Sequence, residues 1–89
     1  MTRTEIVAEY KRIVAAMDDT DHLTNTEWLE RRAAVAKELI AFLSQFDASR
    51  PLFFENQSFP SRSDSIGEKI GHLRASVAMG EFVAGKRAA

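Results

Sequence analysis

The sequence predicts an all-α protein, a small three-helix bundle in which a short first helix precedes a longer antiparallel helical hairpin. Three segments carry apolar residues at helical spacing, and no strand-like alternation extends beyond a few residues. Each segment begins with a threonine or serine that is followed three residues later by glutamate, the pattern of a capping box. Because the chain has only 89 residues, the helices are expected to share one core in a single domain, 1–89.

The first helix is expected at residues 3–17. Thr2 and Glu5 form its predicted capping box. Its apolar residues share one arc about 120° wide, so the helix should bury a single side. They are Ile6, Val7, Tyr10, Ile13, Val14 and Met17.

The second helix is expected at residues 26–46, after a capping box formed by Thr24 and Glu27. It carries two apolar rows. The first holds Trp28, Val35, Leu39, Phe42 and Phe46, and the second holds Leu29, Ala33, Ala36, Ile40 and Leu43. Together they fill an arc of about 180°, wider than the roughly 100° stripe of an ordinary surface helix. This helix should therefore contact two neighbours.

The third helix is expected at residues 63–84, with Ser65 and Glu68 as its capping box and residues 85–89 as a frayed tail. Its apolar face is narrow and holds Ile66, Ile70, Leu73, Val77 and Ala84. Four glycines lie in residues 63–89, and a glycine in the interior of a helix costs about 1 kcal/mol relative to alanine. Gly67, Gly71 and Ala78 share one side, where we expect another helix to approach closely.

The segment between the second and third helices, residues 47–62, is an aromatic loop. It contains Pro51 and Pro60 together with three phenylalanines, Phe53, Phe54 and Phe59. One interpretation is a lid in which these rings fold over the open end of the hairpin. The other is an exposed aromatic patch that docks a partner or another subunit. Both interpretations remain open, and the prolines stiffen the loop in either case.

Composition limits the classes of partner and compartment. The net charge is −1, so neither a polyanion nor an anionic membrane is implied, and no apolar run approaches the roughly 20 residues of a membrane span. The N-terminus has no apolar stretch typical of a secretory signal. The absence of cysteine suits a cytoplasmic protein. Basic residues occur in pairs with acidic residues between them, so a nucleic-acid partner is not expected either.

The sequence offers no catalytic centre, cofactor site or metal site. Asp18, Asp19, Asp21 and His22 are rich in oxygen ligands, but leucine and threonine follow where a calcium loop needs a ligand and a glycine. No serine, histidine and acid form a recognisable nucleophilic set, and the glycines are spread along a helix rather than gathered in a phosphate loop. The protein is therefore predicted not to be an enzyme.

Arg32 is the most informative charged residue, because it lies near the centre of the apolar arc of the second helix. A guanidinium in such surroundings needs a carboxylate partner, a route to solvent or an anionic ligand. One interpretation is an ion pair within the bundle or across a subunit boundary, for which Glu81 is a candidate partner. The other is an anion-binding pocket between helices or subunits, in which Arg74 and Tyr10 would join Arg32.

The hairpin, roughly residues 26–84, resembles a group of small phage proteins. The resemblance lies in the short first helix before a longer hairpin, and in Pro60-Ser61-Arg62, Ser65-Ile66, Ile70, Leu73, Ala75-Ser76 and Val83-Ala84. That group consists of helical-hairpin sponge proteins that sequester cyclic oligonucleotide signals of bacterial immunity. The resemblance implies a symmetric oligomer that binds cyclic nucleotides between its subunits, at sites lined by arginines and an aromatic residue. Arg32, Arg74 and Tyr10 are candidates for those roles.

The function predicted from these features is binding without catalysis, by a self-associating helical protein of a phage or mobile element. Surplus apolar surface motivates the prediction, because three short helices can hide little of it. The expected interface residues are Trp28, Met79, Phe82, Phe53, Phe54 and Phe59. One alternative is an oligomeric sponge for cyclic oligonucleotides or another anionic ligand. The other is an inhibitor that docks a host protein through its aromatic loop.

Overall fold

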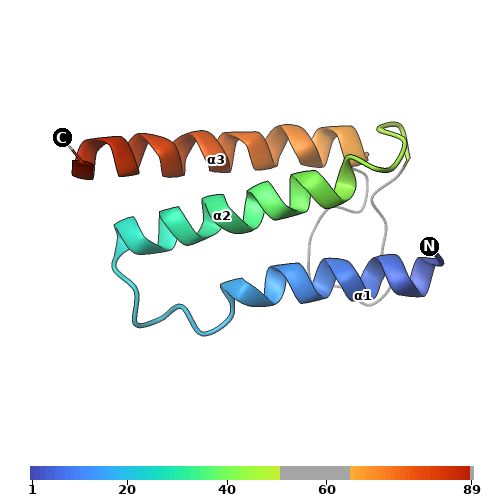
Figure 1. Ribbon diagram of the computed structural model, residues 1–89, viewed down its shortest axis with the longest axis horizontal. Helices are drawn as coiled ribbons and strands as arrows, with labels where there is room; N and C mark the ends of the chain where they lie inside the picture. The colour runs from blue at the N-terminus through green and yellow to red at the C-terminus, as the bar shows by residue number, and fades with distance from the viewer. Residues whose placement is uncertain (51–64, 89) are drawn as a thin grey trace.

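The computed structural model describes residues 1–50 and 65–88, which form three α-helices and one short 3-10 helix (Figure 1). Helix α1 spans Arg3–Val14 and continues into the 3-10 helix η1, Ala15–Met17. Helix α2 spans Asn25–Leu43, and α3 spans Ile66–Ala88. These two ranges of residues contain no β-strand, so the predicted all-α class is confirmed.

Local side-chain hydrogen bonds fix where the helices begin. The backbone N–H of Glu5 donates to Thr2 Oγ1 at 3.2 Å, and the N–H of Thr2 donates to the Glu5 carboxylate at 2.8 Å. Thr24 and Glu27 form the same reciprocal pair at 3.2 and 3.0 Å. These two predicted capping boxes are therefore present, and each satisfies two amides that a helix start leaves without partners.

Helix α3 begins at Ile66 rather than at 63, because its first amides are held by the turn that follows α2. The N–H of Ile66 donates to the carbonyl of Arg50, and that of Gly67 donates to the carbonyl of Ala48, both at 2.9 Å. The N–H of Glu68 donates to Ser65 Oγ at 3.2 Å. Ser65 therefore caps the helix, as predicted from its spacing to Glu68.

The ends of α2 and α3 differ from the prediction. Helix α2 ends at Leu43 instead of at residue 46. Helix α3 continues to Ala88, so the prediction that residues 85–88 form a frayed tail is wrong. The ammonium of Lys86 lies 5.1 Å from the centroid of the Phe82 ring, one helical turn away. Such a pair supports the last turns of a helix, and a cation near the C-terminus also favours the helix dipole.

The three helices run up, down and up, with α2 between the other two (Figure 1). Helix α2 packs against both α1 and α3, while α1 and α3 make no close backbone contact with each other. The two apolar rows of α2 thus face two neighbours, as the wide arc predicted. The buried core joins all three helices and consists of Tyr10, Ile13, Val35, Ala36, Leu39, Leu43, Ile66, Ile70 and Leu73.

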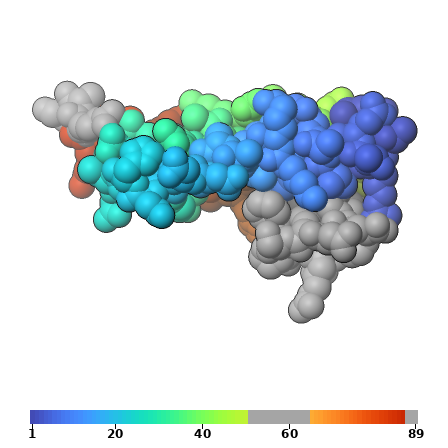
Figure 2. Space-filling model, turned by 90° about the horizontal axis from the view of Figure 1, so that it is seen from below, coloured from blue at the N-terminus to red at the C-terminus, as the bar shows by residue number. Residues whose placement is uncertain are grey.

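Helix α1 covers only the half of the hairpin that lies near the end of α2 and the start of α3 (Figure 1). Seen from the side of α1, that helix and the residues leading from it to α2 form the near surface, with α3 behind them (Figure 2). The other end of the hairpin, with the start of α2 and the end of α3, extends beyond α1. The molecule is accordingly elongated, with extents of 43 × 25 × 20 Å.

Helices α2 and α3 approach each other closely at Gly80. A Cβ atom added there would collide with the Cβ of Ala33 and lie 3.1 Å from the carbonyl oxygen of Leu29. No helix of the described chain makes the predicted approach along Gly67, Gly71 and Ala78, because a Cβ added at Gly71 would meet nothing within 4 Å and Ala78 is exposed. Gly67 is close to Ala48 in the turn rather than to a helix. Gly80 lies on the same face as Leu73 and Val77, which is why it meets α2.

We expect Gly80→Ala to destabilise the fold by about 1–3 kcal/mol, because overpacking against Ala33 outweighs the gain in helix propensity. Gly85→Ala is the matched control, since a Cβ at Gly85 would meet nothing within 4 Å. It should leave stability unchanged or raise it by up to about 1 kcal/mol. Urea unfolding followed by circular dichroism measures both changes. Equal stability of the two variants would show that the helices do not approach at Gly80.

Candidate functional site

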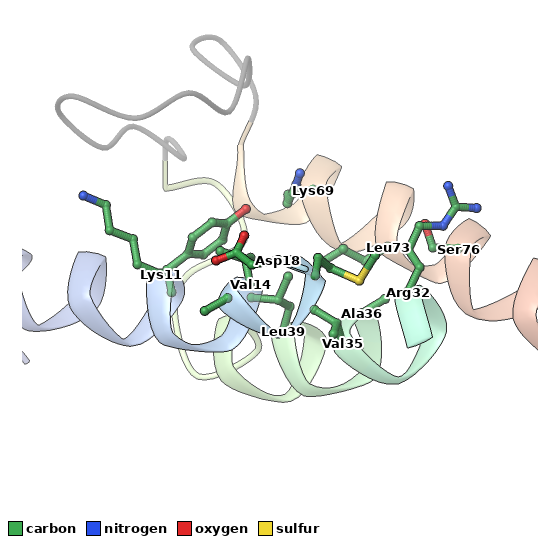
Figure 3. Close-up of a pocket in the computed structure, with 13 residues that line it drawn as sticks. Lys11, Val14, Asp18, Arg32, Val35, Ala36, Leu39, Lys69, Leu73 and Ser76 are labelled. Carbon is green, nitrogen blue, oxygen red and sulfur yellow. The ribbon is translucent and has the colours of Figure 1, made fainter. Parts of the chain in front are cut away.

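A groove lies between α1 and α3, because both helices pack on α2 without closing on each other (Figure 3). Its volume is about 720 Å³. The residues that line it are Tyr10, Lys11 and Val14 of α1, Ala15 and Met17 of η1, Asp18, then Arg32, Val35, Ala36 and Leu39 of α2, and Lys69, Leu73 and Ser76 of α3. Every helix therefore contributes to this one site.

The floor of the groove is apolar. Val35, Ala36 and Leu39 of α2 and Leu73 of α3 are buried residues of the core that also line the groove. The three residues of α2 lie on one face of that helix. The face that α2 buries against its neighbours therefore continues as the floor of the groove. A ligand with an apolar portion would bury that portion against these side chains.

Charge in the groove is mostly positive. Lys11, Arg32 and Lys69 come from three different helices, and Asp18 is the carboxylate that accompanies them. Figure 3 shows the nitrogen atoms of the three cationic side chains on the same side of the apolar floor. This arrangement suits a ligand that has an apolar body and a negative group.

Arg32 has an unusual environment. Its guanidinium carbon lies 5.0 Å from the centroid of the Trp28 ring, a cation–π contact. Its Nε is buried and has no hydrogen-bond partner within the described part of the chain. A buried donor left unpaired costs about 1–3 kcal/mol. Arg32 is thus a donor at the groove that an anion would satisfy.

Within the chain, Glu81 is not the ion-pair partner of Arg32. The carboxylate of Glu81 lies 3.6 Å from the ammonium of Lys37 instead, and both side chains are well exposed. Periodicity had placed Glu81 at the border of the apolar face of α3, but it does not determine which cation of α2 lies opposite. The interpretation of Arg32 as an anion-binding group stays a prediction.

Tyr10 lies at the bottom of one wall, with only 2% of its surface exposed. It belongs to the core cluster and also lines the groove, next to Lys11. Burial raises the pKa of its hydroxyl to about 12, because the charged phenolate would lose its hydration. The Tyr10 side chain therefore stays neutral at ordinary pH, and it presents a hydroxyl group rather than a phenolate.

Two of the three predicted ligand-binding residues come together and the third does not. Arg32 and Tyr10 both line the groove, whereas Arg74 is exposed and does not line it. Sequence reasoning missed Lys11 and Lys69. Lys69 lies three residues after Ile66 and four before Leu73, so its place at the border of the apolar face was available from the spacing.

The expected interface residues also divide. Met79 is 46% and Phe82 is 59% exposed, while Trp28 is half-buried beneath Arg32. Phe53, Phe54 and Phe59 lie outside the described residues. Over residues 1–50 and 65–88, no three histidine or acidic side chains gather as a metal site, and the acidic turn after η1 lies on the surface.

Comparisons of the chain with protein-family models, curated proteins and solved structures gave no significant match. The resemblance to phage sponge proteins therefore stays a prediction, and function has to be argued from the groove. Within the described ranges, no helix has the length and apolar character needed to cross a membrane.

The burial of Tyr10 can be tested by titration, because it is the single tyrosine of the chain. We expect the absorbance of tyrosinate to appear with a midpoint near pH 12 in the folded protein. In denaturant the midpoint should fall to about 10, the ordinary value. Between these two pH values the unfolded chain loses the proton and the folded chain keeps it, so stability should fall as pH rises above about 10. A midpoint near 10 while helicity is intact would contradict the burial of Tyr10.

Proposed function

We propose that this protein acts by binding rather than by catalysis, and that its groove holds a small ligand with an apolar body and an anionic group. One observation carries the proposal. The buried Nε of Arg32 has no hydrogen-bond partner among the described residues, and it borders an apolar floor. An anion placed there would restore the missing hydrogen bond and would meet a positive charge.

The dimensions and chemistry of the groove support a small-molecule site. Pockets that bind such ligands usually measure about 300–1,000 Å³ and combine apolar walls with a few placed polar groups. At about 720 Å³, with Lys11, Arg32 and Lys69 around an apolar floor, the groove has this character. Tyr10, with its pKa raised to about 12, is a poor acid or base at neutral pH, which favours binding over proton transfer.

A second candidate is the binding of a cyclic oligonucleotide, whose phosphates are anions and whose bases are apolar planes. The contact of Arg32 with Trp28 favours it, because an arginine can bind a phosphate and an aromatic ring beside it can stack on a base. In that case the protein would be an accessory protein of a phage or mobile element, acting in the cytoplasm. The docking of a host protein through the aromatic loop depends on residues 51–64, outside the described ranges.

The charge preference of the groove can be measured with anilinonaphthalene sulfonate, a probe with apolar rings and one sulfonate. We expect it to bind, and Arg32→Met to weaken binding by about tenfold, since a hydrogen bond to a charged group is worth about 1.5–3 kcal/mol. Lys37→Met is the matched control, because it removes an exposed cation of the same helix that does not line the groove. It should leave the affinity unchanged.

Two further measurements separate binding from loss of structure. Trp28 is the single tryptophan of the chain and lies against Arg32, so its fluorescence should respond when the sulfonate binds. The neutral probe N-phenylnaphthylamine should bind the parent and Arg32→Met equally, with equal helicity by circular dichroism. If Arg32→Met unfolds, Lys11→Met, at an exposed groove residue, replaces it. If the sulfonate probe binds the parent and every groove variant that folds with equal affinity, the proposal is refuted.

A further inference from the structure

The outer face of α3 carries an apolar stripe that the monomer leaves open. The residues of the stripe are Gly71, Ala75, Ala78, Phe82 and Gly85, spaced alternately four and three residues apart. All of them are exposed, with Phe82 at 59% and its neighbour Met79 at 46%. This alternation is the spacing of a helix–helix seam. It lies opposite the face of α3 that packs against α2.

No other described element covers this stripe. Helix α3 packs against α2 and makes no close backbone contact with α1. A Cβ added at Gly71 or at Gly85 would meet nothing within 4 Å. Glycine in the interior of a helix costs about 1 kcal/mol relative to alanine, and the fold of the monomer gives no reason for either residue.

We propose that two copies of the chain associate through this stripe, with their α3 helices antiparallel and Phe82 of each copy packed on Gly71 of the other. The same register places Ala75 of each copy opposite Ala78 of the other. Small residues at the centre let the helices come close, while the bare backbone at Gly71 leaves room for the ring. A parallel pair would instead set Phe82 against Phe82 and glycine against glycine, so its packing would be poor.

Charge complementarity supports a second copy as the occupant. Arg74 and Glu81 lie two turns apart along the same edge of the stripe, so the antiparallel register brings Arg74 next to the partner's Glu81. Because the dimer would have two-fold symmetry, it would contain this ion pair twice. Arg74 is exposed and has no ion pair elsewhere in the described chain, and the Glu81 side chain is 65% exposed. In the monomer the Glu81 carboxylate lies 3.6 Å from the ammonium of Lys37, and this surface pair leaves the carboxylate exposed enough to accept from the partner's Arg74 as well.

The stripe and the groove are independent sites. Lys69, Leu73 and Ser76 of the groove lie on the opposite side of α3, so the pairing leaves both grooves of a dimer open. Failure of the dimer would not affect probe binding in the groove, and an inert groove would not affect dimer formation. The two proposals can thus fail separately.

Sedimentation of the whole chain over a dilution series tests the association. We expect a monomer–dimer equilibrium that Phe82→Glu shifts to monomer. Arg74→Glu and Glu81→Arg should each weaken the dimer by about tenfold, because two contacts are lost per dimer and become repulsive. The double variant that carries both changes should recover most of the affinity. Asp21→Lys, an exposed charge reversal in the turn before α2, is the control and should have no effect.

Three results would overturn the proposal. The first is a parent chain that remains a monomer at about 1 mM. The second is a dimer that Phe82→Glu does not weaken while its helicity stays intact. The third is a double charge variant that is no tighter than the single variants.

Crosslinking tests the register directly, because the chain contains no cysteine. Chains with Ala75→Cys and chains with Ala78→Cys are mixed and oxidised gently. We expect the mixed disulfide to form faster than either like-with-like disulfide, since only the mixed pair lies directly opposite across the seam. Ala34→Cys, on the exposed side of α2, is the control and should crosslink slowly. Like-with-like disulfides that form fastest would indicate parallel helices and overturn the antiparallel pair.

Discussion

The burial of α2 on two sides is the constraint on which the rest of the structure depends. Its apolar arc is too wide for one neighbour, so α2 packs against both α1 and α3. Leu43, which has no exposed surface, lies where the core draws on all three helices. A domain of this size buries only about 60–65% of the surface of its unfolded chain, so loss of either contact would lower the free energy of unfolding appreciably. The groove follows from the same arrangement, because two helices that meet a third on different sides leave a channel between them.

Arg32 shows what this arrangement does to a charged residue. It belongs to the face that α2 buries, yet it lies at the groove, where α1 and α3 do not meet. The guanidinium carbon lies 5.0 Å from the centroid of the Trp28 ring, a cation–π contact, and Nε is buried. The result is a donor that is partly shielded from water. Electrostatic attraction to an anion is stronger in such a position than at an exposed lysine, because the local dielectric constant is lower.

The sequence determined the helices more reliably than their contacts, for physical reasons. The capping boxes at Thr2 and Thr24 are local, so spacing alone identified them. The two-sided burial of α2 also followed from periodicity. Which residues meet across helices depends on the rotation and offset of each helix, and this is why Glu81 pairs with Lys37 and Gly80 meets Ala33. Only part of the groove could be predicted from the sequence. Lys11 and Lys69 look like any surface lysine in the sequence, and they meet at the groove only because α1 and α3 both pack on α2.

The four glycines of α3 connect the fold to its surface. Two of them have reasons within the monomer, since Gly80 lets α2 approach and Gly67 fits against Ala48. Gly71 and Gly85 have open space around them, and each weakens the helix by about 1 kcal/mol where alanine would not. Small domains have about 5–15 kcal/mol of stability in total, so this cost is appreciable. In the proposed register, a second copy packed on the bare backbone of Gly71 would offset the cost of that residue and would cover Phe82. The same helix would then hold the hairpin together through one face and join two copies through the other.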